Sequence, residues 1–103
     1  MKQTERIAKM EQSRIASEEV LKNLSDALTA YERNQKDLAK LSDYYGSTLW
    51  MKDFEDDEAG KLPKDLKRGV LSEDTLFDLI TDHHELVLRM ARIVTKAIEG
   101  NML

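Results

Sequence analysis

Residues 44–74 read YYGSTLWMKDFEDDEAGKLPKDLKRGVLSED, and they hold three of the four glycines and the only proline of the chain. Gly46 is placed to end a helix, and Ser47 can cap the next helix by accepting a backbone N–H bond. Gly60 stops that second helix, and Pro63 keeps the residue before it extended. This stretch therefore predicts a short helix followed by an ordered loop, set between two longer segments.

The segment before this stretch reads as one long helix. Residues 4–45 contain no glycine or proline, and apolar residues recur there at helical spacing. A heptad frame through Ile7 and Leu21 also passes polar residues such as Arg14, so we expect globular helix packing with some coiled-coil character. This helix outreaches the last one and leaves side chains such as Met10 without an intrachain partner, which predicts a homodimer through the overhang.

A last helix follows the loop. Ser72 supplies an N-cap, and Glu73 and Asp74 give an acidic first turn, while the acids of this segment precede its bases in agreement with the helix dipole. No segment alternates as a strand does. The sequence thus predicts an all-α fold, a long helical hairpin with a short intervening helix and an ordered loop at one end. The expected elements of a single domain over 1–103 are a helix over 3–45, a short helix over 47–58, an ordered loop over 59–71 and a helix over 72–99.

Composition narrows the classes of function. A net charge of −4 disfavours direct nucleic-acid binding, since phosphate contacts need a surplus of Lys and Arg on one face, and it disfavours a membrane surface for the same reason. The absence of cysteine excludes disulfides, thiol catalysis and cysteine-ligated zinc. Neither a signal peptide nor a membrane-spanning run is evident, so we expect a cytoplasmic protein.

The acidic run over 53–58 is a weak candidate for a metal site. Asp53, Asp57 and Glu58 offer the oxygen ligands that Mg²⁺ and Ca²⁺ prefer, and a metal-dependent enzyme using these carboxylates is one alternative function. The spacing is not that of an EF-hand, so a solvated surface partly neutralised by the basic residues that follow is favoured, and no cofactor is expected. His83 falls on the apolar stripe of the last helix and reads as a core histidine.

The basic loop and the aromatic residues around it each allow two interpretations. Arg68 could grip a phosphate or an acidic partner, or it could tie down backbone groups while the apolar loop residues plug the loop onto the helix end. Those apolar residues are Leu62, Leu66, Val70 and Leu71. Four of the six aromatic residues are Tyr44, Tyr45, Trp50 and Phe54. They read either as interface anchors or as a small core, and the core is favoured for Trp50 and Phe54.

These features together predict a non-enzymatic protein–protein interaction module that docks through residues 44–69. The candidate contact residues are Tyr44, Tyr45, Trp50, Asp53, Lys64, Lys67 and Arg68. Complementary charge would set partner choice and association rate. An immunity protein, an antitoxin or a phage inhibitor of a host defence enzyme is an alternative that the small size and acidity also fit.

Residues 44–80, YYGSTLWMKDFEDDEAGKLPKDLKRGVLSEDTLFDLI, resemble the signature of the domain of unknown function 4298 family (DUF4298), a group of small bacterial and phage proteins. That pattern has paired tyrosines after a long helix, a tryptophan, an Asp-Phe-Glu acidic run, and Leu-Pro-x-Asp-Leu-Lys-Arg-Gly-Val-Leu-Ser-Glu-Asp before a final helix. The outer helices resemble the family by helical pattern alone. The resemblance implies membership and supplies no reaction, substrate or partner.

Overall fold

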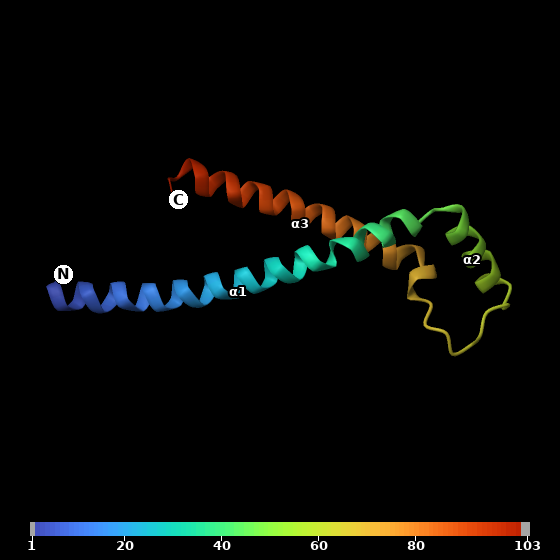
Figure 1. Ribbon diagram of the computed structural model, residues 1–103, viewed down its shortest axis with the longest axis horizontal. Helices are drawn as coiled ribbons and strands as arrows, with labels where there is room; N and C mark the ends of the chain where they lie inside the picture. The colour runs from blue at the N-terminus through green and yellow to red at the C-terminus, as the bar shows by residue number, and fades with distance from the viewer. Residues whose placement is uncertain (1, 102–103) are drawn as a thin grey trace. The chain divides into compact units, whose positions relative to one another are not determined.

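A computed structural model describes residues 2–101, and every regular element in it is helical (Figure 1). In chain order the elements are α1 (Gln3–Tyr44), α2 (Thr48–Glu58), the 3-10 turn η1 (Gly69–Leu71) and α3 (Glu73–Glu99). No strand occurs within the described range, so the all-α class is confirmed. Pairing of the two long helices along their length stays a prediction.

Two glycines and a serine set the helix ends around α2. Gly46 and Gly60 have φ of 76° and 71°, the left-handed region that side chains other than glycine rarely adopt, and each follows the end of a helix. Ser47 accepts a hydrogen bond on its Oγ from the backbone N–H of Trp50 at 3.1 Å, which confirms its role as the N-cap of α2.

The start of α3 differs from the prediction in its capping. The helix begins at Glu73, but the Ser72 hydroxyl accepts no hydrogen bond from the first turn, so the predicted side-chain cap is wrong. The backbone N–H of Ser72 instead donates to the carbonyl of Gly69 at 3.1 Å and closes the η1 turn. The acidic first turn remains, with Glu73 and Asp74 beside the positive end of the helix dipole.

The chain falls into two compact units that divide at Lys36, within α1. From Gln3 to Lys36 the described part of the first unit is a single helix. Its apolar side chains, such as Ile7, are exposed because this unit has no second element to cover them. Arg14, where the heptad pattern is interrupted, pairs with carboxylates on the same helix. Its Nε lies 2.6 Å from Glu11 and its Nη1 lies 2.7 Å from Glu18.

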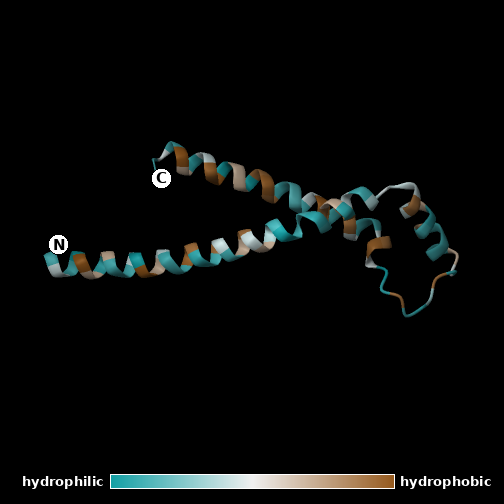
Figure 2. Ribbon diagram, viewed as in Figure 1, coloured by the Kyte–Doolittle hydropathy of each residue, from teal (hydrophilic) through white to brown (hydrophobic). Residues whose placement is uncertain are grey.

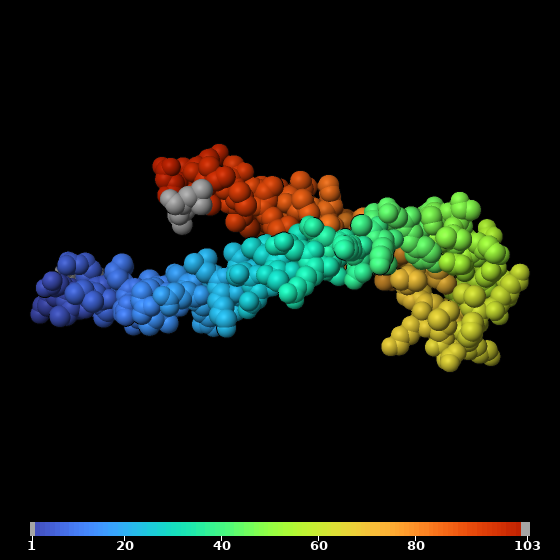
Figure 3. Space-filling model, in the orientation of Figure 1, coloured from blue at the N-terminus to red at the C-terminus, as the bar shows by residue number. Residues whose placement is uncertain are grey.

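The second unit contains the buried core. Trp50, Leu71 and Leu76 are buried against one another, with Trp50 only 3% and Leu76 only 2% exposed. Partly buried side chains packed around them are Leu41, Tyr44, Tyr45, Phe54 and Leu62. We call residues 44–72 the cap, and Figure 3 shows its α2 and loop atoms, green to yellow, as one closely packed body. The cap therefore joins the end of α1 to the start of α3.

Beyond its first turn, α3 is an amphipathic helix with exposed apolar side chains. Brown bands recur along its length in Figure 2. Leu76 is the one residue of α3 that is fully buried, while Leu86 and Ile93 are 51% and 55% exposed. None of the helices within residues 2–101 is both long and apolar enough to cross a membrane.

Candidate functional site

Trp50 fixes the 3-10 turn onto α2. Its Nε1 donates a hydrogen bond to the carbonyl of Val70 at 2.9 Å. Its ring stacks on Phe54 with centroids 5.3 Å apart, and it meets Tyr45 edge to face at the same separation. These contacts support the interpretation of the aromatic residues as a small core. The buried indole offers almost no surface to a partner, whereas Tyr45 stays half-buried at the edge of the cluster.

Arg68 holds the loop together from within. Its guanidinium donates to the carboxylate of Asp57 and to the carbonyl of Pro63, and its Nε donates to the carbonyl of Leu66 at 3.3 Å. A planar guanidinium suits such multiple contacts. Because each of the three guanidinium nitrogens of Arg68 already has a partner within the cap, the geometry favours its structural role over the binding of a phosphate.

Tyr44 ties the end of α1 to α2. Its hydroxyl donates to Oδ2 of Asp53 at 2.6 Å. Burial, and then the hydrogen bond and negative charge of Asp53, raise the pKa of Tyr44 to about 12. The hydroxyl therefore remains a protonated donor at any physiological pH, and Asp53 keeps a fixed partner.

The acidic run is largely paired within the cap. Asp56 lies 3.4 Å from Nζ of Lys52 and 4.0 Å from Nζ of Lys61. The three metal candidates of the sequence analysis are Asp53, Asp57 and Glu58. Asp53 accepts a hydrogen bond from Tyr44, Asp57 accepts one from Arg68, and Glu58 is exposed. Within residues 2–101 no group of three or more His, Cys, Asp or Glu side chains is placed to hold a metal ion.

A pocket of about 330 Å³ opens beside the loop, between α2 and η1. Its lining consists of four aliphatic side chains, one tyrosine, one aspartate and two basic residues: Leu62, Leu66, Val70, Leu71, Tyr44, Asp53, Lys67 and Arg68. Concave sites with aliphatic walls and a few polar groups are typical binding sites. Lys67 is exposed at this pocket, and Lys64 is exposed on the same loop.

The structure separates the apolar loop residues that sequence reasoning grouped as a plug. Leu71 is buried and Leu62 packs against the core, but Leu66 and Val70 are 49% and 39% exposed. The plug interpretation is therefore wrong for Leu66 and Val70. The sequence does contain an indication that Leu66 is exposed, because it has a charged neighbour on each side. A loop residue between two charged residues tends to stay at the surface.

Comparison with known proteins identifies a family. No curated protein and no solved structure matches the chain. A family model described as a domain of unknown function, DUF4298, matches residues 7–93. The matched range contains the whole cap, including the paired tyrosines, Trp50 and the loop held by Arg68, which are the residues that carried the resemblance. Since the match spans most of its length, the chain belongs to the DUF4298 family.

Proposed function

We propose that this chain is a protein–protein interaction module that docks a partner on the cap. The observation that carries the proposal is the pocket beside the loop, with exposed Leu66 and Val70 in its wall and the cation of Lys67 at the same place. Apolar pockets with a charged neighbour are suited to hold an anchor side chain of a partner and to orient it.

Preorganisation of the loop supports this function. The hydrogen bonds of Arg68 and the indole of Trp50 fix the loop at both ends. A surface that is already ordered loses little conformational entropy when a partner binds, so more of the contact energy appears as affinity. Ordered loops on a rigid support are also where binding residues concentrate.

The charges on the loop indicate the chemistry of the partner. Within the described residues, neither Lys64 nor Lys67 pairs with a carboxylate. The partner segment that fits best therefore presents an apolar side chain next to acidic residues. An immunity protein, antitoxin or phage inhibitor would be a special case in which the docked partner is a toxin or a defence enzyme. The non-enzymatic character and the cytoplasmic location stay predictions.

The test uses exposed residues, because Arg68 and Trp50 cannot be changed without disturbing the cap. Wild-type protein, Leu66→Glu/Lys67→Glu and the control Leu49→Glu/Lys40→Glu are used to capture partners from native cells. The control makes the same chemical change at exposed positions away from the pocket. We expect a stoichiometric partner that the control retains and the pocket variant loses by roughly 100-fold in affinity, as for a central anchor. Equal capture by both variants would reject the pocket as the docking site.

A further inference from the structure

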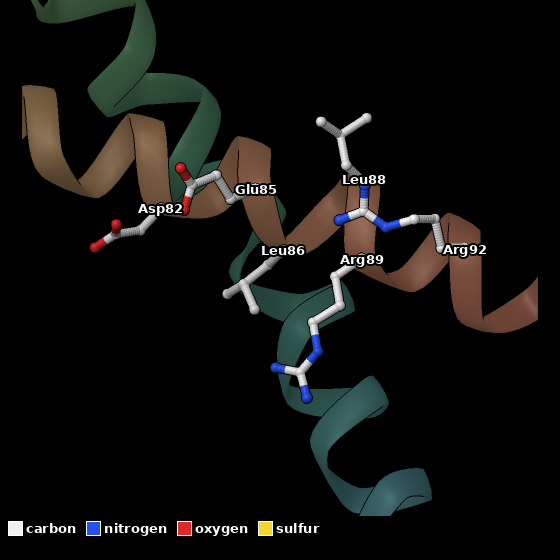
Figure 4. A pocket seen from close by; sticks show the side chains of 6 residues that line it. All are labelled: Asp82, Glu85, Leu86, Leu88, Arg89 and Arg92. Atoms are coloured by element: carbon white, nitrogen blue, oxygen red, sulfur yellow. The ribbon is translucent and has the colours of Figure 1, made fainter.

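We infer that α3 pairs antiparallel with α3 of a second copy of this chain, about a two-fold axis at Leu86. The surface concerned is drawn in Figure 4, where Asp82 and Glu85 precede Leu86 on the helix and Arg89 and Arg92 follow it. These side chains line a shallow hollow on α3. The inference does not depend on docking at the cap, so either proposal can fail alone.

All but one of the charged residues of α3 lie along one flank of the helix. They are Asp74, Asp78, Asp82, Glu85, Arg89, Arg92, Lys96 and Glu99. Successive members are three or four residues apart, which is the spacing of one helix face. From Asp74 to Lys96, every acid on this flank comes before Leu86 and every base comes after it, and Glu99 in the last turn is the one exception. Over residues 74–96 the flank is therefore negative before Leu86 and positive after it.

Such a flank is complementary to itself when one copy is turned around. With a two-fold axis at Leu86, a residue that comes a given number of positions before Leu86 in one copy faces the residue that comes the same number of positions after Leu86 in the other copy. Asp82 then faces the turn that carries Arg89, and Asp78 faces the turn that carries Arg92. A two-fold interface needs this kind of self-complementary patch. A parallel pair would instead set acid against acid and base against base, which is unfavourable.

The helix dipole alone does not account for this order. Its effect on side-chain charges falls off within the first and last turns of a helix. Asp82 and Arg89 lie in the middle of α3, which runs from Glu73 to Glu99. The change of sign around Leu86 thus occurs where the dipole has little influence, and pairing between copies gives it a physical reason.

Apolar residues border the charged flank and supply the seam. Leu79, Leu86 and Ile93 are each seven residues apart and exposed. With the axis at Leu86, Leu79 of one copy faces Ile93 of the other, and the two Leu86 side chains meet. A second apolar row, with Val87 and Val94, adjoins the first. The apolar face of α3 is therefore broader than the a/d face that one partner helix covers in a coiled coil. A second helix could pack on the part that the first partner leaves uncovered.

Charge reversal followed by mixing tests the antiparallel arrangement. We expect wild-type protein to be a dimer by light scattering or sedimentation. Asp78→Lys/Asp82→Lys and Arg89→Glu/Arg92→Glu should each weaken it by roughly 10- to 100-fold, since like charges then face each other. An equimolar mixture should restore a mixed dimer. A monomeric wild type, or variants that each remain dimeric, would overturn the inference.

Cross-linking locates the axis without disturbing the fold, because the chain has no cysteine of its own. Leu86→Cys should oxidise to a covalent dimer, as two copies of one residue at a two-fold axis come within disulfide range. Leu88→Cys is the control and should cross-link far more slowly, because Leu88 borders the same hollow but is exposed and points away from Leu86 in Figure 4. Rapid cross-linking of Ile7→Cys with none at Leu86→Cys would place the contact on α1 and refute the pairing of α3.

Discussion

Leu76→Ala should remove a large part of the stability of the cap. Leu76 is the most deeply buried side chain of the core and connects α3 to Trp50 and Leu71. The substitution deletes about three carbon groups at about 0.8 kcal/mol each, and the residual cavity adds to this transfer term. We therefore expect a loss of about 3 kcal/mol in the free energy of unfolding, within the range known for buried Leu→Ala changes.

The assay is urea unfolding followed by the fluorescence of Trp50, the only tryptophan of the chain. With a denaturant slope of about 2 kcal/mol per molar, the midpoint should fall by roughly 1.5 M. Leu49→Ala makes the same substitution at a side chain that is 71% exposed, and it should change stability by less than about 0.5 kcal/mol. Equal shifts for the two variants would show that the cap core is not the centre of stability.

Three further predictions concern single contacts of the cap. Trp50→Phe leaves the carbonyl of Val70 without its donor and should lower the unfolding free energy by about 1–3 kcal/mol at unchanged native helicity, measured by circular dichroism in urea. Arg68→Lys keeps the charge but loses the multiple contacts, so amide hydrogens of the loop should exchange faster while those of α3 do not. For Tyr44, a folded pKa of about 12 lies above the unfolded value, so its stabilising contribution is complete below about pH 10 and is lost as pH rises through 12. In Tyr44→Phe this contribution is absent. The urea midpoint of the variant should therefore fall less between about pH 10 and pH 12 than that of the wild type.

The sequence predicts the helix ends well because local chemistry determines them. Gly46 and Gly60 occupy left-handed backbone positions, and Ser47 caps α2, all within a turn of the residues they affect. Helical periodicity with no interruption likewise predicts α1 over nearly its full length. These features depend on the spacing of neighbouring residues, and no tertiary contact is needed to infer them.

Contacts between distant positions could not be predicted in the same way. The hydrogen bond of Trp50 reaches a carbonyl 20 residues away, and Arg68 selects Asp57 among several nearby carboxylates. Nothing in the spacing of the charges distinguishes that choice. The exposure of Leu66 also depends on how the loop is tied down, since its apolar character alone would place it in the core.

The cap and the exposed face of α3 differ in how much a bound partner would add to their packing. Within the described residues, no buried polar side-chain atom lacks a hydrogen-bond partner, and the aromatic cluster of the cap is closed around Trp50. The surface of the cap therefore needs no partner to satisfy its buried groups, and it suits a partner that binds reversibly. From Leu79 onward, however, no side chain of α3 is fully buried, although helices in proteins are stabilised chiefly by packing an amphipathic face. A second copy lying along Leu86 would supply that packing, so we expect self-association to be the more permanent contact and docking at the cap the more readily reversed one.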